Sequence, residues 1–268
     1  MRKSAALIVA FVLLAGCRTG RNYTSPDGPR YAGAPPAAEG RSARGDTLRI
    51  ASFNIEYALH VDSAIAVLTS DTALRRADVL LLQEMDEPGT RKLAAALGMG
   101  YVYYPATLRA KSGRDFGNAV LARWPIAEDA KIRLPHAGIV GRTQRIATAA
   151  TVRVGEVPVR IYSAHLGTMV NATPAARRGQ MRAILADAER FPRVIIGGDM
   201  NSHGVGNAPR AQGYAWLTEN GPRTTKFGRW DHIFTKGLPS AGPGASGTVL
   251  DVRGASDHRP VWADVVVR

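Results

Sequence analysis

The stretch Asp78-Val79-Leu80-Leu81-Leu82-Gln83 decides the fold class of this chain. Its central residues are apolar without interruption, which is typical of a strand buried on both faces of a sheet. The surrounding sequence predicts further strands over 48–53, 101–104, 118–121, 146–154, 157–165, 193–197, 230–235, 248–252 and 260–267. Apolar residues at helical spacing predict helices over about 62–76, 90–97 and 174–190. Many strands with few intervening helices favour a four-layer α/β sandwich, in which two packed β-sheets are flanked by helices.

Length and composition fit one large globular domain. The chain has 268 residues, of which 45% are hydrophobic and 21% charged. Its formal net charge of +13 favours anionic partners, namely nucleic acid, phospholipid head groups or other phosphorylated substrates. The charge does not choose among these partners, and a general preference for arginine would also explain it.

The N-terminal residues have the pattern of an export signal. Arg2 and Lys3 precede an uncharged apolar run from Ala5 to Ala15, which is too short for an ordinary membrane-spanning helix. Leu14-Ala15-Gly16-Cys17 resembles the bacterial lipobox, whose cysteine becomes the lipidated first residue of the mature protein. We therefore predict a lipoprotein signal peptide over 1–17 and an exported protein of the cell envelope, anchored to a membrane through lipidated Cys17. The alternative is a chance cysteine after an ordinary signal peptide.

Two further divisions follow from composition. Residues 18–46 are rich in Gly, Pro, Ala and Arg without apolar periodicity, which predicts a flexible tether. Residues 47–268 are predicted to form one folded domain, which we expect to be monomeric. Cys17 is the single cysteine, so the fold contains no internal disulfide and no cysteine-rich metal site.

Polar residues stand where the predicted buried strands end. If the strands lie side by side, these residues converge on one rim: Asn54, Glu84, His165, Asp199, Asn201, Asp231, Asp257 and His258. The four carboxylates of this set would repel one another strongly unless a cation or protons intervened. Carboxylate and amide oxygens suit a hard ion, so we expect Mg²⁺, with Mn²⁺ or Ca²⁺ as alternatives. Each motif alone is also compatible with an ordinary turn or helix cap.

Eight motifs occur together in one order. They are 51–55 (ASFNI), 82–84 (LQE), 117–121 (GNAVL), 145–147 (RIA), 163–166 (SAHL), 198–201 (GDMN), 230–234 (WDHIF) and 256–260 (SDHRP). Taken together, they resemble the endonuclease/exonuclease/phosphatase superfamily of metal-dependent, deoxyribonuclease I-like hydrolases, over about Leu48 to Val267. The resemblance implies a metal-dependent phosphoric ester hydrolase.

The resemblance also implies a role for each matching residue. Glu84 would bind the divalent ion, with Asn54 and Asp257 close to it. His258 would be the general acid/base, oriented by Asp231. Asp199 and Asn201 would position the attacking water and the phosphate. His165 would contact a phosphate oxygen or the leaving group. Arg145 would support the site electrostatically. Both Asp199 and His258 are candidates for the base that deprotonates water.

The resemblance leaves the substrate open, because one scaffold serves many phosphoesters. We expect a phosphodiesterase or nuclease acting outside the cytoplasm. A phosphodiesterase of phospholipid or sphingomyelin head groups is the main alternative. A non-catalytic polyanion-binding lipoprotein is a third possibility, although such a protein would not need Asp231 behind His258.

Overall fold

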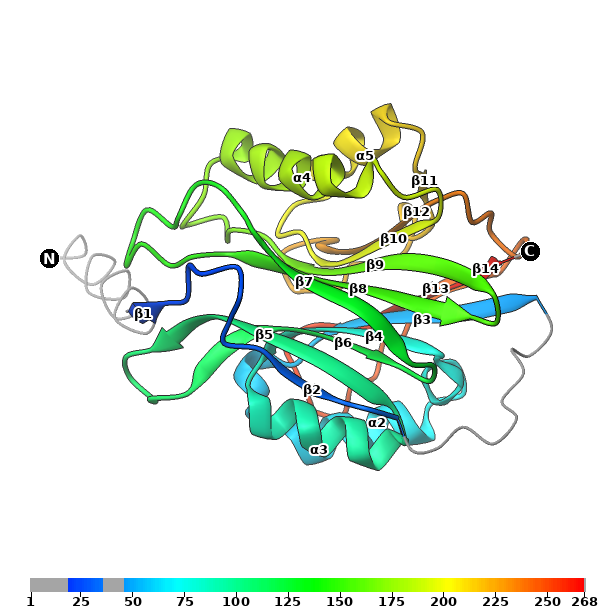
Figure 1. Ribbon diagram of the computed structural model, residues 1–268, viewed down its shortest axis with the longest axis horizontal. Coiled ribbons are helices and arrows are strands. Elements are labelled where there is room, and N and C mark those ends of the chain that lie inside the picture. Colours follow the sequence, from blue (N-terminus) through cyan, green and yellow to red (C-terminus); the bar gives the residue numbers. More distant parts are fainter. Residues whose placement is uncertain (1–18, 36–45, 268) are drawn as a thin grey trace, which may run out of the picture.

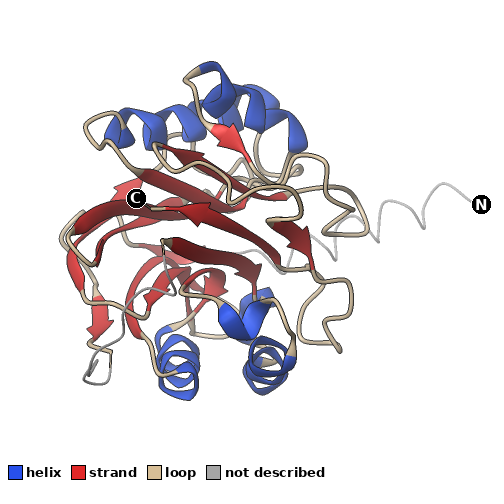
Figure 2. Cartoon of the chain, turned by 90° about the vertical axis from the view of Figure 1, so that its right-hand side faces the viewer, coloured by secondary structure: helices blue, strands red, loops and turns tan. Residues whose placement is uncertain are grey.

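The computed structural model describes residues 19–35 and 46–267, and these form two β-sheets packed face to face with helices on both outer faces (Figure 1, Figure 2). The predicted four-layer α/β sandwich is therefore confirmed. In the described part of the chain, no helix combines the length and apolar character needed to cross a membrane. The proposed signal peptide and Cys17 lie outside the described residues.

The first sheet has eight strands. In sheet order these are β1 (Thr19–Asn22), β5 (Gly100–Arg109), β6 (Asp115–Ala122), β4 (Val79–Met85), β3 (Thr47–Asn54), β14 (Val261–Val266) and β13 (Ser246–Thr248), while β2 (Tyr31–Gly33) also pairs with β5. The second sheet has six strands, in the order β11 (Ala215–Trp216), β12 (Asp231–Lys236), β10 (Val194–Asp199), β9 (Val157–His165), β8 (Ile146–Val154) and β7 (Ile126–Arg133). The β3–β4 and β9–β10 pairs are parallel.

Each sheet has its own helices. The first is covered by α2 (Val61–Ser70) and α3 (Glu87–Leu97), and the second by α4 (Pro174–Ala188) and α5 (Asn207–Ala211) (Figure 1). Short 3₁₀ turns complete the set: η1 (Glu56–Ala58), η2 (Leu74–Arg76) and η3 (His203–Gly206). Three apolar clusters hold these layers together, one between the sheets and one beneath each pair of helices. Because both faces of the central strands are covered, these strands carry uninterrupted apolar runs.

Two predicted elements differ from the observed ones, and one observed strand was not predicted. The helix expected over 62–76 ends at Ser70, because the Asp71 carboxylate accepts hydrogen bonds from the N–H groups of Ala73 and Leu74 and starts η2. The strand expected over 248–252 stops at Thr248, and the next residues leave the sheet to pack beside α2. Strand β7 was not predicted because it is an edge strand with few buried side chains.

The prediction of a flexible tether over 18–46 is wrong for residues 19–35. Strands β1 and β2 both pair with β5 in antiparallel register. The Tyr23 hydroxyl donates to Asp115 at 2.8 Å, and the Arg30 guanidinium binds Asp129. These side-chain contacts, rather than apolar periodicity, hold the segment on the domain. Residues 36–45 lie outside the described part of the chain.

Candidate active site

Three site residues lie side by side on neighbouring strands of the second sheet. Asp199 ends β10, and it is in register with His165 on parallel strand β9 and with Asp231 on antiparallel strand β12. All three are buried. The convergence that the sequence predicted at the ends of these strands is therefore observed for this trio.

Gly198 explains why β9 and β10 can approach so closely at this point. Its φ is +143°, and a Cβ atom built on it would lie 1.9 Å from the carbonyl oxygen of Ala164. Only glycine tolerates both the conformation and the contact. The glycine of the Gly198-Asp199-Met200-Asn201 motif thus places the Asp199 carboxylate next to His165.

Glu84 reaches the site through an irregularity in β4. Its φ is +58°, and the register between β4 and β6 shifts between Leu82 and Met85. Such a bulge redirects a side chain out of the regular alternation. The Glu84 carboxylate consequently accepts hydrogen bonds from the Asn54 side chain at 3.3 Å and from the Tyr57 backbone N–H at 3.1 Å.

Asn54 joins the two sheets at the centre of the site. Its Nδ2 atom lies 3.3 Å from both Glu84 Oε1 and Asp199 Oδ2, while its Oδ1 atom accepts from the Glu56 N–H. Asn201 supports Asp199 from the other side, because its backbone N–H and its side-chain amide both donate to the carboxylate. The Asp199 Oδ2 atom thus accepts hydrogen bonds from two amide side chains, those of Asn54 and Asn201.

His258 is paired with Asp231 on the rim. The Nδ1 atom of His258 lies 2.9 Å from Asp231 Oδ2, and its Nε2 atom lies 3.8 Å from Asp199 Oδ2. Burial lowers the pKa of His258, but the charges of Asp231 and Asp199 outweigh burial and hold the pKa well above its usual value. The ring therefore carries a proton at neutral pH, with Nδ1–H directed to Asp231.

His165 has the opposite electrostatic character. Its Nε2 atom lies 3.4 Å from Asp199 Oδ2. Within residues 19–35 and 46–267, neither ring nitrogen has a hydrogen-bond partner of normal geometry. Burial, together with the positive charges of Arg145 and His258, lowers its pKa well below the usual value. The neutral ring is therefore available to a group that enters the site.

Arg145 supplies fixed positive charge to the same region. Its side chain is buried, and its guanidinium lies 5.4 Å from the centre of the Phe116 ring. Its charge lowers the pKa values of both Glu84 and His165. Arg145 is therefore close enough to Glu84 and His165 for its charge to act on both.

The carboxylates have the properties expected of a cation site. Burial raises the pKa of Asp199 to about 7 and also raises the pKa of Glu84, in both cases against the lowering effect of His258. Two desolvated carboxylates that share Asn54 as a neighbour would be stabilised by a bound cation. Their oxygen donors fit Mg²⁺, Mn²⁺ or Ca²⁺. The residues present therefore fit a hard divalent ion.

Three residues of the site lie close enough together to bind one ion, but they are not the residues predicted as metal ligands. Asp199, Asp231 and His258 each offer a donor atom within 4.8 Å of the others. The His258–Asp231 hydrogen bond already occupies one donor of each residue, so the arrangement is better suited to orienting an imidazole than to binding an ion. Glu84 as the ligand remains a prediction.

Asp257 is placed differently from Glu84 and Asn54. It is exposed at the rim, and its backbone N–H donates to Glu56 Oε2 at 3.0 Å. Its charge nevertheless acts on the site, because it raises the pKa values of Glu84 and His258. Asp257 thus lies near the other predicted site residues. In the described part of the chain, it makes no direct hydrogen bond to any of them.

Several supporting residues were missed by sequence reasoning. Gln83 on β4 donates to Ser163 on β9 at 3.0 Å, which fastens the two sheets directly behind the site. The Asn118 amide on β6 bridges to the carbonyls of Ile146 and Ser163. Glu56, which binds the Asp257 N–H, lies in a turn with positive φ. The signal in the sequence is that Gln83, Asn118 and Ser163 stand within the 82–84, 117–121 and 163–166 motifs, although no role was assigned to them.

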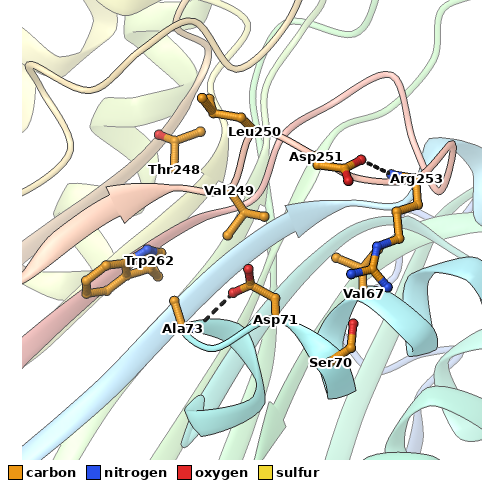
Figure 3. A pocket seen from close by; sticks show the side chains of 10 residues that line it. All are labelled: Val67, Ser70, Asp71, Ala73, Thr248, Val249, Leu250, Asp251, Arg253 and Trp262. Carbon is orange, nitrogen blue, oxygen red and sulfur yellow. Dashed lines mark hydrogen bonds between the residues drawn. The ribbon is translucent and has the colours of Figure 1, made fainter.

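Two cavities of the described residues border the segment that leads to Asp257 and His258. One, of about 510 Å³, borders Asp257 and His258 and is lined by four basic residues, Arg223, Lys226, Arg253 and Arg259. The other, of about 370 Å³, lies between the end of α2 and the 248–253 segment (Figure 3). In it Asp71 and Asp251 accept hydrogen bonds from N–H groups of their own loops, and it contains no predicted site residue. The basic cavity is the one that continues the site.

The two-sheet sandwich and its rim of carboxylates and imidazoles define the class of deoxyribonuclease I-like α/β sandwich proteins. The family model of the endonuclease/exonuclease/phosphatase family matches residues 51–258. The chain therefore belongs to the endonuclease/exonuclease/phosphatase family, whose members hydrolyse phosphoesters and depend on divalent metals. No protein with curated function matches the chain in sequence.

Solved structures with the same fold come from bacteria and from an animal. The endonuclease/exonuclease/phosphatase from Beutenbergia cavernae has a TM-score of 0.67 and 20% identity, covering 83% of this chain and 72% of that one. D. rerio TDP2 complexed with single strand DNA product has a TM-score of 0.63 and 21% identity, covering 82% and 98%. Sphingomyelinase C from Streptomyces griseocarneus has a TM-score of 0.59 and 17% identity, covering 82% and 99%. These similarities show the shared fold.

Proposed function

We propose that this chain is a divalent-metal-dependent phosphodiesterase that hydrolyses a P–O ester by in-line attack of water on phosphorus. The observation that carries the proposal is the buried hydrogen bond between His258 and Asp231 next to the Asp199 carboxylate. An imidazole oriented by one carboxylate and facing a second is suited to proton transfer. A protein that only binds polyanions has no use for this arrangement.

The pKa values of Asp199 and His258 are both raised, and the two proton-transfer roles follow from the protonation that each group has at neutral pH. Asp199, with a pKa of about 7, accepts a proton from the attacking water as the new P–O bond forms. His258, which is protonated at neutral pH, donates a proton to the leaving oxygen as the old P–O bond breaks. Asp231 keeps the ring oriented through Nδ1, so that Nε2 faces the reaction.

Charge on the phosphoryl oxygens is stabilised by groups that are already in place. The neutral His165 ring can donate a hydrogen bond, and the Arg145 guanidinium provides fixed positive charge nearby. Mg²⁺ bound by Glu84, with Asn54 and Asp257 close to it, would supply Lewis-acid stabilisation of the same oxygens. Mn²⁺ and Ca²⁺ suit the same oxygen donors.

A substrate screen tests this function. The full-length chain is assayed with bis-p-nitrophenyl phosphate, plasmid DNA, RNA, sphingomyelin and phosphate monoesters, each with Mg²⁺, Mn²⁺ or Ca²⁺. We expect at least one diester to be hydrolysed in a metal-dependent manner, and monoesters to be poorer substrates. Equal binding of DNA with and without EDTA, in the absence of any turnover, would instead support the polyanion-binding alternative.

The proposed place of action is the bacterial cell envelope, with Cys17 carrying the lipid. Support comes from the lipobox-like Leu14-Ala15-Gly16-Cys17 and from the preceding apolar run. The test is incorporation of labelled palmitate by the unmodified chain and by Cys17→Ser. Labelling of the unmodified chain alone is the expected result, and equal labelling of both would contradict the proposal.

A further inference from the structure

The loops around the site carry exposed apolar side chains. Among residues 19–35 and 46–267, six large apolar side chains are more than half exposed, with exposed fractions from 54% to 72%: Leu59, Ile139, Met169, Val170, Phe227 and Leu250. Leu59, Met169, Val170 and Phe227 lie in loops next to strand ends that carry Asn54, His165 or Asp231. Ile139 lies in the β7–β8 loop, which carries Arg145, and Leu250 lies in the β13–β14 loop, which carries Asp257 and His258. Exposed apolar side chains gathered on one functional face mark an interaction surface rather than ordinary scatter.

Two of these side chains occupy the centre of a tight turn after His165. The Asn171 N–H donates to the Thr168 carbonyl at 3.0 Å, which places Met169 and Val170 at the two central positions of the turn. Such positions favour Gly, Pro, Asn, Asp or Ser. The turn geometry therefore does not explain two adjacent aliphatic side chains there.

The same turn is firmly attached to the domain. The Ile139 N–H donates to the Asn171 carbonyl at 3.0 Å, which ties the loop that carries Ile139 to the turn that carries Met169 and Val170. Buried Arg177 on α4 donates to the carbonyls of Thr168 and Ala172. Because the loop is already ordered, contact with a partner does not require further ordering of its backbone.

A second turn presents apolar surface beside His258. The Thr225 hydroxyl accepts hydrogen bonds from the N–H groups of Phe227 and Gly228, both at 3.1 Å. Lys226 and Phe227 form the tip of this turn, and the Phe227 ring stacks on Trp230 with 5.4 Å between ring centres. A cation and an exposed ring thus project together next to the catalytic histidine.

Positive charge accompanies both turns. Arg142 follows Ile139 in the first loop region, while Arg223, Lys226 and Arg253 line the cavity beside His258, and all four are exposed. Leu250 borders the same cavity. Basic side chains next to exposed apolar ones are the combination that binds an anionic lipid surface.

We infer that this face docks on an anionic phospholipid bilayer, with Met169, Val170 and Phe227 entering the interface and the basic residues contacting head groups. Docking then presents lipid phosphodiesters to His258, an inference that rests on the proposed function. Single-stranded nucleic acid is less well suited to this surface, because bases stack on aromatic rings and five of the six exposed side chains are aliphatic. Aliphatic side chains gain most from an acyl environment.

Site-specific fluorescence tests the docking. Cys17 is the only cysteine, so the full-length chain with Cys17→Ser accepts a single cysteine at a chosen position. An environment-sensitive fluorophore is attached through Met169→Cys, Phe227→Cys or, as a control, Arg153→Cys, which is exposed near the β8–β9 turn at the opposite end of the sheets. The probes are phosphatidylcholine vesicles with and without phosphatidylglycerol, and a single-stranded oligonucleotide.

We expect a blue shift at 169 and 227 with the anionic vesicles and none at 153. No shift at 169 and 227, or an equal shift at all three positions, overturns the inference. A response at 227 to the oligonucleotide but not to vesicles also overturns it and favours a nucleic-acid surface. The fluorescence measurement reports binding to vesicles and does not depend on hydrolysis. Failure of the docking is therefore distinguishable from failure of the proposed function, which is measured separately with bis-p-nitrophenyl phosphate.

A kinetic test uses the double variant Met169→Ser, Val170→Ser. Hydrolysis of phospholipid in anionic vesicles is expected to fall by on the order of tenfold, because the variant loses apolar interface contact. Hydrolysis of soluble bis-p-nitrophenyl phosphate is expected to stay within about twofold, because neither side chain belongs to the catalytic centre. Equal loss on both substrates, or no loss on vesicles, contradicts the docking.

Discussion

His258 Nδ1 lies 2.9 Å from Asp231 Oδ2, although 27 residues separate the two in sequence. Asp231 starts β12 in the second sheet, whereas His258 lies three residues before the start of β14 in the first. The pair therefore forms only when the sandwich is closed. It also fixes the imidazole so that its other nitrogen faces Asp199.

Replacement of Asp231 by Asn should uncouple the histidine from its orienting carboxylate. Loss of this negative charge lowers the pKa of His258, and kcat is expected to fall by on the order of 10²- to 10⁴-fold. Steady-state kinetics and NMR titration of the His258 ring measure the two effects. An unchanged pKa together with kcat within about twofold of the unmodified protein would be inconsistent with the assigned role.

Glu84→Gln should weaken metal activation more than it affects the fold. The variant keeps the shape of the side chain but removes the charge that attracts a divalent ion. We expect the Mg²⁺ concentration for half-maximal activity to rise by on the order of tenfold or more, as measured by titration of turnover. Glu128→Gln, at an exposed position on β7, is the matched control and should leave the titration unchanged.

Asp199 should make the metal-free protein less stable as pH rises. The pKa of this carboxyl is raised from 3.8 to about 7, so between these values the folded protein holds a proton that the unfolded chain has lost. Its contribution to the free energy of unfolding therefore decreases from about pH 4 to pH 7. In EDTA, the Tm of Asp199→Asn should fall less between pH 5 and pH 8 than the Tm of the unmodified protein does. An equal or larger loss would refute this assignment.

Gly198→Ala should be strongly destabilising. A Cβ atom would meet the Ala164 carbonyl at 1.9 Å, and φ of +143° is unfavourable for any residue with a side chain. We expect a loss of roughly 3 kcal/mol or more in the free energy of unfolding, measured by urea denaturation. Gly113→Ala provides the comparison, because φ there is also positive but no atom lies within 4 Å of the added Cβ. A similar cost for both variants would show that the close approach is unimportant.

The sequence predicts the buried strands well because both faces of the central strands are covered, so that runs such as Val79 to Leu82 need no alternation. It also predicts which residues end these strands. It does not predict how Glu84 is directed, because this depends on a register shift against β6. The inter-sheet contacts of Asn118 and Gln83 depend on how the layers pack, and no periodicity encodes that.

The edges of the fold were hardest to predict for a related reason. Strands β1 and β2 have little apolar alternation and are held by pairing with β5 and by contacts such as Tyr23 with Asp115. The exposed position of Asp257 likewise reflects the turn in which its N–H donates to Glu56. Both outcomes depend on partners that are distant in sequence.

The most direct test of the central claim is the turnover of bis-p-nitrophenyl phosphate by the unmodified chain and by His258→Gln, each with Mg²⁺ and with EDTA. The catalytic assignment predicts turnover by the unmodified chain only when Mg²⁺ is present, and a reduction by on the order of 10²-fold or more in His258→Gln. Equal turnover by the two proteins, or turnover that persists in EDTA, would contradict it.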